Sequence, residues 1–266
     1  MDWERDPEWL LSHVMKRPRL ELLLDGSSKM NPTQQEEYRT LLTRRAEGEP
    51  LQYIIGSQDF MGLCFLVDHR VLIPRQDTEI LIEESIEVLK SLHRTEAQVL
   101  DIGSGSGAIG ISIAKFIPSC QVVAVDISEG ALELSLENAK RNGVEQQMCF
   151  LQSDLTDGLS AKDHGRYDVI VSNPPYIPSS ELAYLQREIR DHEPMEALDG
   201  GEDGLALYRR MAHYTPSFLK VDGTVLWEIG YNQAIAVCQL LLTDFYDIRV
   251  LKDLAGMDRI VTARKR

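Results

Sequence analysis

The segment Asn173-Pro174-Pro175-Tyr176 contains residue types that can hold an amino group in place. The side-chain oxygen of Asn173 and the main-chain carbonyl of Pro174 are two acceptors, and an NH2 group has two hydrogens to donate. An amide or aromatic amine nitrogen is a poor nucleophile, because its lone pair is delocalised. Two acceptors would fix such a nitrogen and let the lone pair develop toward a reaction partner. The segment therefore predicts chemistry on a planar NH2 nitrogen.

The rest of this segment suits the same task. Tyr176 offers a flat surface for a planar group, and Pro174 and Pro175 stiffen the loop. If the transferred group is already activated, positioning and charge stabilisation supply most of the rate, and no strong base is required before attack. A surface turn is the alternative, since Asn-Pro is common turn chemistry. A glycine loop and carboxylates earlier in the chain favour the catalytic interpretation.

Residues 99–110 predict a strand, a glycine-rich turn and the start of a helix. Glycines let the main chain bend sharply and let a ligand approach it closely. The spacing of Gly105, Gly107 and Gly110 also fits the dinucleotide-binding fingerprint. Taken alone, that match does not identify a cofactor.

Three aspartates follow predicted strands around this turn. Asp101 can serve the cationic amino group of a methionine moiety, directly or through water, whereas it would repel a pyrophosphate. Asp126 would accept hydrogen bonds from both hydroxyls of a ribose. Asp154 either reaches an adenine amino group or is a loop or helix-capping residue. Asp101 therefore favours S-adenosylmethionine over a nicotinamide dinucleotide, whereas Asp126 supports nucleoside binding without choosing between them.

An alternation of strands and helices must position these residues. Strands are predicted at Gln98–Ile102, Val122–Asp126, Cys149–Leu151, Asp168–Val171, Thr224–Glu228, Asp247–Leu251 and Arg259–Ala263, and helices at Gly107–Phe116, Gly130–Arg141, Gly204–Leu219 and Gln233–Leu242. Repeated strand–helix units predict a parallel sheet covered on both faces. The link Lys252–Asp258 is too short for a crossover helix, so the last two strands are predicted to be antiparallel.

Residues 1–50 predict a helical N-terminal domain. Glu8–Lys16 and Gln34–Arg45 have amphipathic spacing, and Asn31-Pro32-Thr33 is a helix start. The run Gly48-Glu49-Pro50 breaks this pattern and predicts a domain boundary.

Residues 51–76 predict a β-hairpin linker. The strand formers are Phe60, Cys64, Phe65, Leu66, Val67, Val71 and Ile73, and Met61-Gly62 is the predicted turn. Residues 77–266 then form the predicted catalytic domain, which begins with a helix at Thr78–Leu92.

Composition excludes several other classes. The chain has 266 residues and a formal net charge of −14, which disfavours long-range attraction to a bare phosphate backbone. The four cysteines form no Cys-x-x-Cys pair and the six histidines show no metal-ligand spacing, so we expect free, buried thiols and no metal site. No apolar stretch approaches the roughly 20 residues of a membrane span. The start, Met1 to Arg5, resembles no secretory or transit signal, so a cytoplasmic protein is expected.

Nearly the whole chain resembles the HemK/PrmC-type protein-(glutamine-N5) methyltransferases of peptide-chain release factors. The matching segments are Pro50 to Ile54 with Gly56, Phe60, Gly62, Val71 to Arg75, Asp77 to Glu79, Asp101 to Ile109, Asp126, Ser172 to Ile177, Glu193-Pro194, Ala197-Leu198, Gly200-Gly201, Asp203-Gly204, Glu228 to Gly230, Gln233, Asp253 and Asp258-Arg259. Asn-Pro-Pro-Tyr also occurs in DNA and RNA amino-methyltransferases. The Leu-Gln-Tyr-Ile and Ile-Pro-Arg segments are far more specific to the release-factor family.

The resemblance implies a seven-stranded Rossmann-like class I methyltransferase fold, with the last strand antiparallel. It implies methyl transfer from S-adenosylmethionine to the glutamine of a Gly-Gly-Gln loop in a release factor, with the helical domain helping to hold that partner. A monomer, with no direct nucleic-acid or membrane contact, is expected. One departure is Gln76, where the family usually has proline, which would loosen the loop that carries Arg75 and Thr78.

The predicted site has two parts. Asn173, Pro174 and Tyr176 are the predicted catalytic residues, and with Pro175 they form the substrate-binding set. The predicted cofactor-binding set comprises Arg75, Thr78, Asp101, Gly103, Ser104, Gly105, Ser106, Gly107, Asp126, Ile127, Asp154, Leu155 and Asn173. The inclusion of Arg75 and Thr78 rests on the resemblance alone, and helix entry with a threonine cap is the other interpretation.

Three other functions stay open. An adenine-N6 or cytosine-N4 methyltransferase would use the same acceptors on a flipped-out base, although the acidic charge and the lack of a basic recognition domain disfavour it. A non-catalytic cofactor-binding protein with a decayed site is the second. A nicotinamide oxidoreductase is the third.

Overall fold

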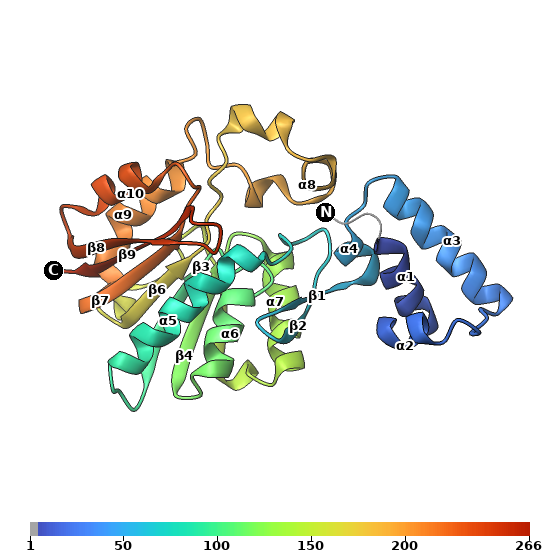
Figure 1. The fold of residues 1–266 in the computed structure, drawn as a ribbon. Coiled ribbons are helices and arrows are strands. Elements are labelled where there is room, and N and C mark those ends of the chain that lie inside the picture. Colours follow the sequence, from blue (N-terminus) through green and yellow to red (C-terminus); the bar gives the residue numbers. More distant parts are fainter. Residues whose placement is uncertain (1–4) are drawn as a thin grey trace.

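The computed structural model describes residues 5–266 and shows two parts joined by a connector (Figure 1). The N-terminal part contains α1 (Asp6–Met15), α2 (Arg19–Leu24), α3 (Pro32–Ala46) and α4 (Leu51–Ile55). Leu10, Val14, Leu41 and Ile54 form its buried core. Asn31 caps α3 reciprocally with Gln34, which confirms the predicted helix start. The two predicted helices are confirmed, whereas α2 and α4 were not predicted.

The connector contains a two-stranded hairpin, β1 (Ser57–Phe60) and β2 (Leu63–Leu66). Met61 and Gly62 make its turn with positive φ angles of 52° and 71°, as predicted. The prediction that Val71 and Ile73 belong to strands is wrong, because both lie outside any strand. Their side chains are buried at 1% and 2% exposure, so packing rather than strand pairing explains their apolar character. The domain limits at residues 50 and 76 stay predictions.

The catalytic part is a seven-stranded sheet with the order β5-β4-β3-β6-β7-β9-β8. Its strands are β3 (Ala97–Ile102), β4 (Cys120–Asp126), β5 (Met148–Gln152), β6 (Tyr167–Ser172), β7 (Leu219–Glu228), β8 (Phe245–Lys252) and β9 (Asp258–Lys265). The first five are parallel to one another, and β9 runs antiparallel between β7 and β8. This order confirms the predicted class I methyltransferase topology, including the antiparallel last strand.

Helices cover both faces of this sheet. They are α5 (Glu79–Ser91), α6 (Ala108–Phe116), α7 (Glu129–Asn142), α9 (Ala206–Phe218) and α10 (Ala234–Leu241), whereas α8 (Arg187–His192) contributes to neither core of the sheet. The short 3-10 helices are η1 (Gln76–Thr78), η2 (Glu145–Gln147), η3 (Ala161–Asp163), η4 (Ser179–Tyr184) and η5 (Met195–Ala197). Residues of α5, α6 and α7 share one core with the sheet, and residues of α9 and α10 share the other. Among residues 5–266, no helix is long and apolar enough to cross a membrane.

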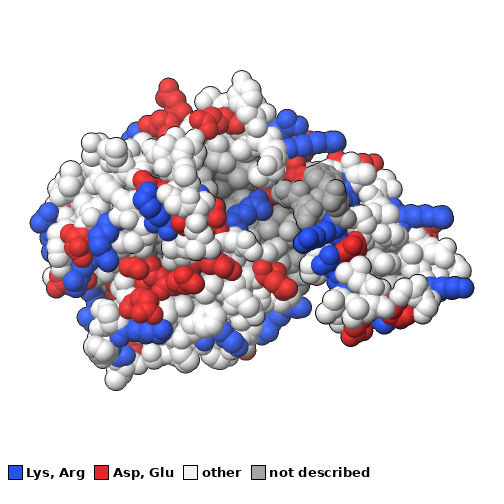
Figure 2. Space-filling view, viewed as in Figure 1, with Lys and Arg blue, Asp and Glu red and all other residues white. Residues whose placement is uncertain are grey.

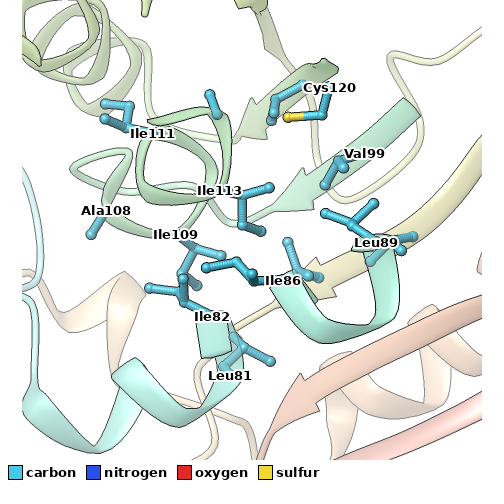
Figure 3. Close-up of a cluster of buried hydrophobic side chains, with 14 of the residues drawn as sticks. Leu81, Ile82, Ile86, Leu89, Val99, Ala108, Ile109, Ile111, Ile113 and Cys120 are labelled. Atoms are coloured by element: carbon cyan, nitrogen blue, oxygen red, sulfur yellow. The ribbon is translucent and has the colours of Figure 1, made fainter. Parts of the chain in front are cut away.

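Alternation along the strands supplies both cores. On β3, Val99 packs toward α5 and α6, while Leu100 and Ile102 pack toward α9 and α10. Figure 3 shows Ile82 and Ile86 of α5 next to Ile109 and Ile113 of α6 on the first face. Burying each such side chain stabilises the fold by about 1.5–3 kcal/mol. All four cysteines are free; Cys120 is buried as predicted, whereas Cys149 is exposed on the edge strand β5.

The segment between β6 and α9 ties the two parts together. Arg45 of α3 forms ion pairs with Glu188 of α8 and with Asp6 of α1, each at 2.7 Å. Arg45 and Glu188 are buried at 4% and 6% exposure. Because a buried charge is costly without its partner, the pair holds α8 against the helical part.

Packing around Gly107, at the start of α6, gives a stability prediction. An alanine Cβ there would lie 2.3 Å from Ser135 Oγ and 2.6 Å from Ile111 Cδ1, at a φ of +81°. Gly143 is a matched control, because its φ is +72° and nothing lies within 4 Å of the methyl group that alanine would add. We expect Gly143→Ala to lose about 1–2 kcal/mol of unfolding free energy and Gly107→Ala about 1–3 kcal/mol more. Urea unfolding without ligand measures both, and equal losses would contradict the expected clash.

Candidate functional site

The candidate site lies at the carboxyl ends of three neighbouring parallel strands. The pairing of Ile102 with both Val125 and Ser172 brings the loops after β3, β4 and β6 to one edge of the sheet. A cavity of about 670 Å³ opens there. Its lining includes the glycine loop, the ends of β4 and β5, Asn173 and the last part of the connector. Ligands of open α/β sheets bind at this edge.

The glycine loop is a shaped main-chain wall of the cavity. Gly103 and Gly105 have φ angles of +71° and +56°, and nothing lies within 4 Å of the Cβ that either lacks. The N–H groups of Gly103 and Ser104 donate to the Val125 carbonyl, which fixes the loop. Residues 103 to 106 line the cavity, as predicted for a cofactor loop, whereas Gly107 lies behind it against Ser135. The open space in front of these glycines is room for a ligand.

Asp101 lies beneath this loop and does not line the cavity. It is fully buried, and its Oδ2 accepts a 3.0 Å hydrogen bond from the N–H of Gly110 in α6. Its Oδ1 is buried without a hydrogen-bond partner. Burial raises the pKa of Asp101 to about 7, against the hydrogen bond from Gly110. Its predicted service to a cationic amino group stays a prediction.

Asp126 faces the cavity from the end of β4. Its Oδ2 accepts from the Gly105 N–H at 2.8 Å and its Oδ1 from the Ser128 N–H at 2.9 Å. These bonds fix the carboxylate and leave each oxygen further acceptor capacity. Burial nevertheless raises the pKa of Asp126. Ile127, the next residue, also lines the cavity and is 57% exposed, which makes it an apolar surface beside a fixed acid.

Asp154 and Leu155 line the cavity after β5. Asp154 Oδ1 pairs with Nη1 of Arg210 at 3.0 Å, and both side chains are partly exposed. Arg210 comes from α9 and also lines the cavity, although no local pattern in the sequence pointed to it. Leu155 adopts a left-handed φ of 51°. Any ligand contact of Asp154 must therefore share the carboxylate with a guanidinium.

Asn173 lines the cavity immediately after β6. Its Nδ2 donates to the Thr78 Oγ1 at 3.3 Å. Within residues 5–266, no donor reaches the Asn173 Oδ1 or the Pro174 carbonyl. Pro175 lines the cavity too, whereas the buried Pro174 and the ring of Tyr176 do not contribute to the lining. The loop thus holds two unpaired acceptors, one of them on Asn173, which lines the ligand-sized space.

Several contacts pin this loop from behind. The Tyr176 carbonyl accepts from Gln233 Nε2 at 2.9 Å, and a Cβ on Gly204 would lie 2.3 Å from the same oxygen. A Cβ on Gly200 would lie 2.8 Å from the Tyr176 Cα. Gln233 also accepts from the Gly230 N–H at 2.9 Å, so one side chain joins the ends of β6 and β7. These contacts leave the loop little freedom.

Comparisons with known proteins decide the family. Residues 2–56 match the PrmC N-terminal domain and residues 78–192 match the Methyltransferase small domain. The release factor glutamine methyltransferase of Geobacter sulfurreducens is 42% identical over 97% of this chain and 88% of that protein. That of Fusobacterium nucleatum is 40% identical over 98% of this chain and 73% of that protein. The chain belongs to the family of release factor glutamine methyltransferases.

A solved methyltransferase structure from Pyrococcus furiosus is similar in fold alone. Its TM-score is 0.55 at 18% identity, and the match covers 87% of this chain and 98% of that chain. The likeness agrees with the sheet order and with methyltransferase family membership. The resemblance inferred from the sequence is therefore confirmed.

Two further polar contacts of this family member lie at the rim of the cavity. Arg75 forms an ion pair with Glu193, whose side chain is buried, and Arg75 and Thr78 both line the cavity. Thr78 is only 4% exposed and is the N-cap residue of α5, so helix entry is confirmed, but its side chain makes no capping hydrogen bond. Its hydroxyl is engaged with Asn173 instead. Among residues 5–266, no group of three or more His, Cys, Asp or Glu side chains is arranged to hold a metal ion.

Sequence reasoning missed the importance of Glu228, which lies behind Asn173 at the end of β7. It is 2% exposed. Burial raises its pKa to about 7, while hydrogen bonding with Thr78 and Asn173 and the charge of Arg259 oppose the rise. Its Oε2 is buried without a hydrogen-bond partner. The glutamate was visible only as part of the Glu-Ile-Gly segment of the family pattern.

The raised pKa of Glu228 predicts a pH effect on stability. Its ordinary value is 4.5, so between pH 4.5 and about 7 the folded chain holds a proton that the unfolded chain has lost. The free energy of unfolding therefore falls as pH rises through this window and levels off above it. Glu228→Gln cannot titrate, so its stability relative to wild type should rise from pH 5 to pH 8.

Urea unfolding of both proteins at the two pH values measures this difference. Asp101 shifts in the same direction but is present in both proteins, so its effect cancels. A stability difference that stays constant with pH would refute the shifted titration.

Proposed function

We propose that this protein transfers a methyl group from S-adenosylmethionine to the side-chain amide nitrogen N5 of the glutamine in the Gly-Gly-Gln motif of peptide-chain release factors. The observation that carries the proposal is a pair of unpaired acceptors in one loop: the Oδ1 of Asn173, which lines the cavity, and the carbonyl of the next residue, Pro174. Two acceptors match the two hydrogens of a primary amide. The names of the relatives support glutamine as the source of that amide.

The chemistry needed from the chain is positioning. The two acceptors orient the NH2 group and stabilise the positive charge that grows on nitrogen as the new N–C bond forms. The proton leaves after the nitrogen has become cationic, so no strong base must act first. Pro174 and Pro175 and the pinned Tyr176 carbonyl keep the acceptors in place before the substrate arrives.

The cavity residues fit S-adenosylmethionine, which when bound supplies an activated methyl group on a sulfonium. Gly103 and Gly105 leave open space along the main chain for its amino-acid part. The fixed carboxylate of Asp126 can accept from ribose hydroxyls, and Ile127 gives an apolar surface for a nucleobase. Asp154 and Leu155 lie next to that surface, where Asp154 can accept from an adenine amino group.

The protein substrate suits this site in shape and charge. Two glycines before the glutamine would let a narrow loop enter the cavity. A net charge of −14 on the enzyme would favour encounter through a basic surface of the factor. We further propose that the enzyme works as a monomer in the cytoplasm and that its helical N-terminal domain helps to hold the factor.

Methylation of an exocyclic amine in a nucleic acid is the second candidate, because the same acceptors would fit adenine N6 or cytosine N4. On the face that Figure 2 shows, basic and acidic side chains are interspersed over the catalytic part. Together with the net charge of −14, this arrangement disfavours binding to phosphate backbones. Tight DNA binding that weakens steeply with salt would favour this candidate instead.

Mass spectrometry of a purified release factor, incubated with the enzyme and S-adenosylmethionine, tests the function. The proposal predicts one added methyl group on the glutamine of Gly-Gly-Gln. A factor that stays unmodified while the enzyme binds the cofactor would contradict it, and would support a non-catalytic cofactor-binding role. Binding of a nicotinamide dinucleotide in place of S-adenosylmethionine would point to an oxidoreductase.

Two variants should separate the part of the site that holds the substrate amide from the part that binds the cofactor. Asn173→Ala should lower kcat at least ~100-fold with little change in cofactor affinity, because it removes an acceptor from the reacting nitrogen. Asp126→Ala should mainly weaken cofactor binding. Steady-state kinetics and calorimetric cofactor titration measure the two effects, and the assignment is wrong if both variants show the same pattern.

A further inference from the structure

Three elements meet behind the Asn173 side chain. Ser172 pairs with Trp227 across the parallel strands β6 and β7, so the next residues, Asn173 and Glu228, lie side by side. Thr78 approaches from the start of α5, which packs against both strands. The Thr78 and Glu228 side chains are 4% and 2% exposed, and Asn173 is half-buried and reaches the cavity. A polar cluster therefore separates the acceptor loop from the core.

The orientation of the Asn173 carboxamide decides what the cavity presents. Its oxygen accepts hydrogen bonds and its nitrogen donates them, although the two ends have nearly the same shape. An outward oxygen can hold a substrate NH2 group. An outward nitrogen would place the donating NH2 group of Asn173 opposite the donating NH2 group of the substrate, and that hydrogen bond would be lost. Neighbouring residues must therefore keep the Asn173 nitrogen directed inward.

Thr78 alone cannot select the orientation. A hydroxyl can accept from the Asn173 Nδ2 or, after rotation, donate to the Asn173 Oδ1. Glu228 breaks this symmetry, because strand register sets its buried carboxyl, an acceptor, beside Asn173, and hydrogen bonding with Thr78 and Asn173 opposes the rise of its pKa. Once the Thr78 hydrogen is directed to Glu228, the Thr78 oxygen can only accept, and the observed 3.3 Å contact with Nδ2 follows.

We propose that Glu228 and Thr78 are positioning residues that fix the Asn173 carboxamide with its oxygen toward the substrate nitrogen. The inference rests on the proposed function. It explains what orients the acceptor oxygen of Asn173 on which that function depends. Neither residue touches the substrate amide; both act through Asn173.

A role in stability does not explain the glutamate. The Glu228 Oε2 atom is buried with no hydrogen-bond partner, and burying such a group costs free energy. Arg259 lies close enough to oppose the pKa rise, but it forms its ion pairs with Asp253 and Asp77. An apolar residue of similar size at position 228 would avoid the burial cost. Replacing Glu228 with such a residue should therefore stabilise the fold while it lowers the activity.

Paired variants of the full-length enzyme test the inference, with a Gly-Gly-Gln peptide as substrate. Glu228→Leu removes the acceptor and Glu228→Gln keeps one; likewise Thr78→Val removes the hydroxyl and Thr78→Ser keeps it. Thr262→Val is the matched control, because Thr262 is a buried threonine whose hydroxyl has no partner. The measurements are kcat, KM for the peptide, the cofactor Kd and the melting temperature.

We expect Glu228→Leu and Thr78→Val to lower kcat about 10- to 100-fold, since small misplacements at the reacting centre have large effects. Glu228→Gln keeps an acceptor and Thr78→Ser keeps the hydroxyl, so the kcat of each should lie within about 5-fold of wild type. Cofactor Kd should change much less than kcat, Glu228→Leu should melt no lower than wild type, and Thr262→Val should keep its kcat.

Three results would overturn the inference. One is a Glu228→Leu enzyme with wild-type kcat. Another is a Glu228→Gln enzyme as slow as Glu228→Leu. The third is a loss of kcat that follows a lower melting temperature or a weaker cofactor Kd. A wild-type enzyme that leaves the peptide and the release factor unmethylated would instead overturn the proposed function, so the two failures are distinguishable.

Discussion

The proposed activity depends first on which end of the Asn173 carboxamide faces the substrate. A primary amide substrate has two N–H donors, and the proposed site provides two acceptors for them, the Asn173 Oδ1 and the Pro174 carbonyl. The second is fixed by the covalent chain, whereas the first belongs to a side chain that can turn over. The Thr78 contact at 3.3 Å holds the nitrogen end inward, and Glu228 lies beside both residues. In the proposed function, reactivity therefore depends on a buried polar cluster as much as on the loop that carries the two acceptors.

The fold places this cluster through strand register. Parallel pairing of β6 with β7 sets Asn173 beside Glu228, and pairing of β6 with β3 sets the same loop beside the glycine turn. The antiparallel β9 completes the sheet on the far side of β7 and brings Arg259 near the cluster. Gln233 and Gly204 then close the loop from behind. The central strands β3 and β6 are almost completely buried, so a shift of their register would be costly and the loops at their ends are held in place.

Local patterns made much of this predictable from the sequence. The alternation of strands and helices, the glycine turn and the Asn-Pro-Pro-Tyr segment are each encoded in consecutive residues, and the structure has them where they were predicted. Pairings between distant elements were not readable. Arg210 meets Asp154 from α9, Glu228 meets Asn173 only through register, and the Arg45–Glu188 pair joins residues 143 positions apart. Val71 was wrongly predicted to lie in a strand, because a buried segment without regular structure can contain the same apolar residue types as a strand.

The most direct test is a crystal structure of the enzyme with S-adenosylhomocysteine and a peptide that carries Gly-Gly-Gln. We predict that the glutamine NH2 group lies within hydrogen-bond distance of both the Asn173 Oδ1 and the Pro174 carbonyl, with the Asn173 Nδ2 still directed to Thr78. A glutamine side chain bound elsewhere, or an Asn173 carboxamide whose nitrogen faces the substrate, would contradict this prediction.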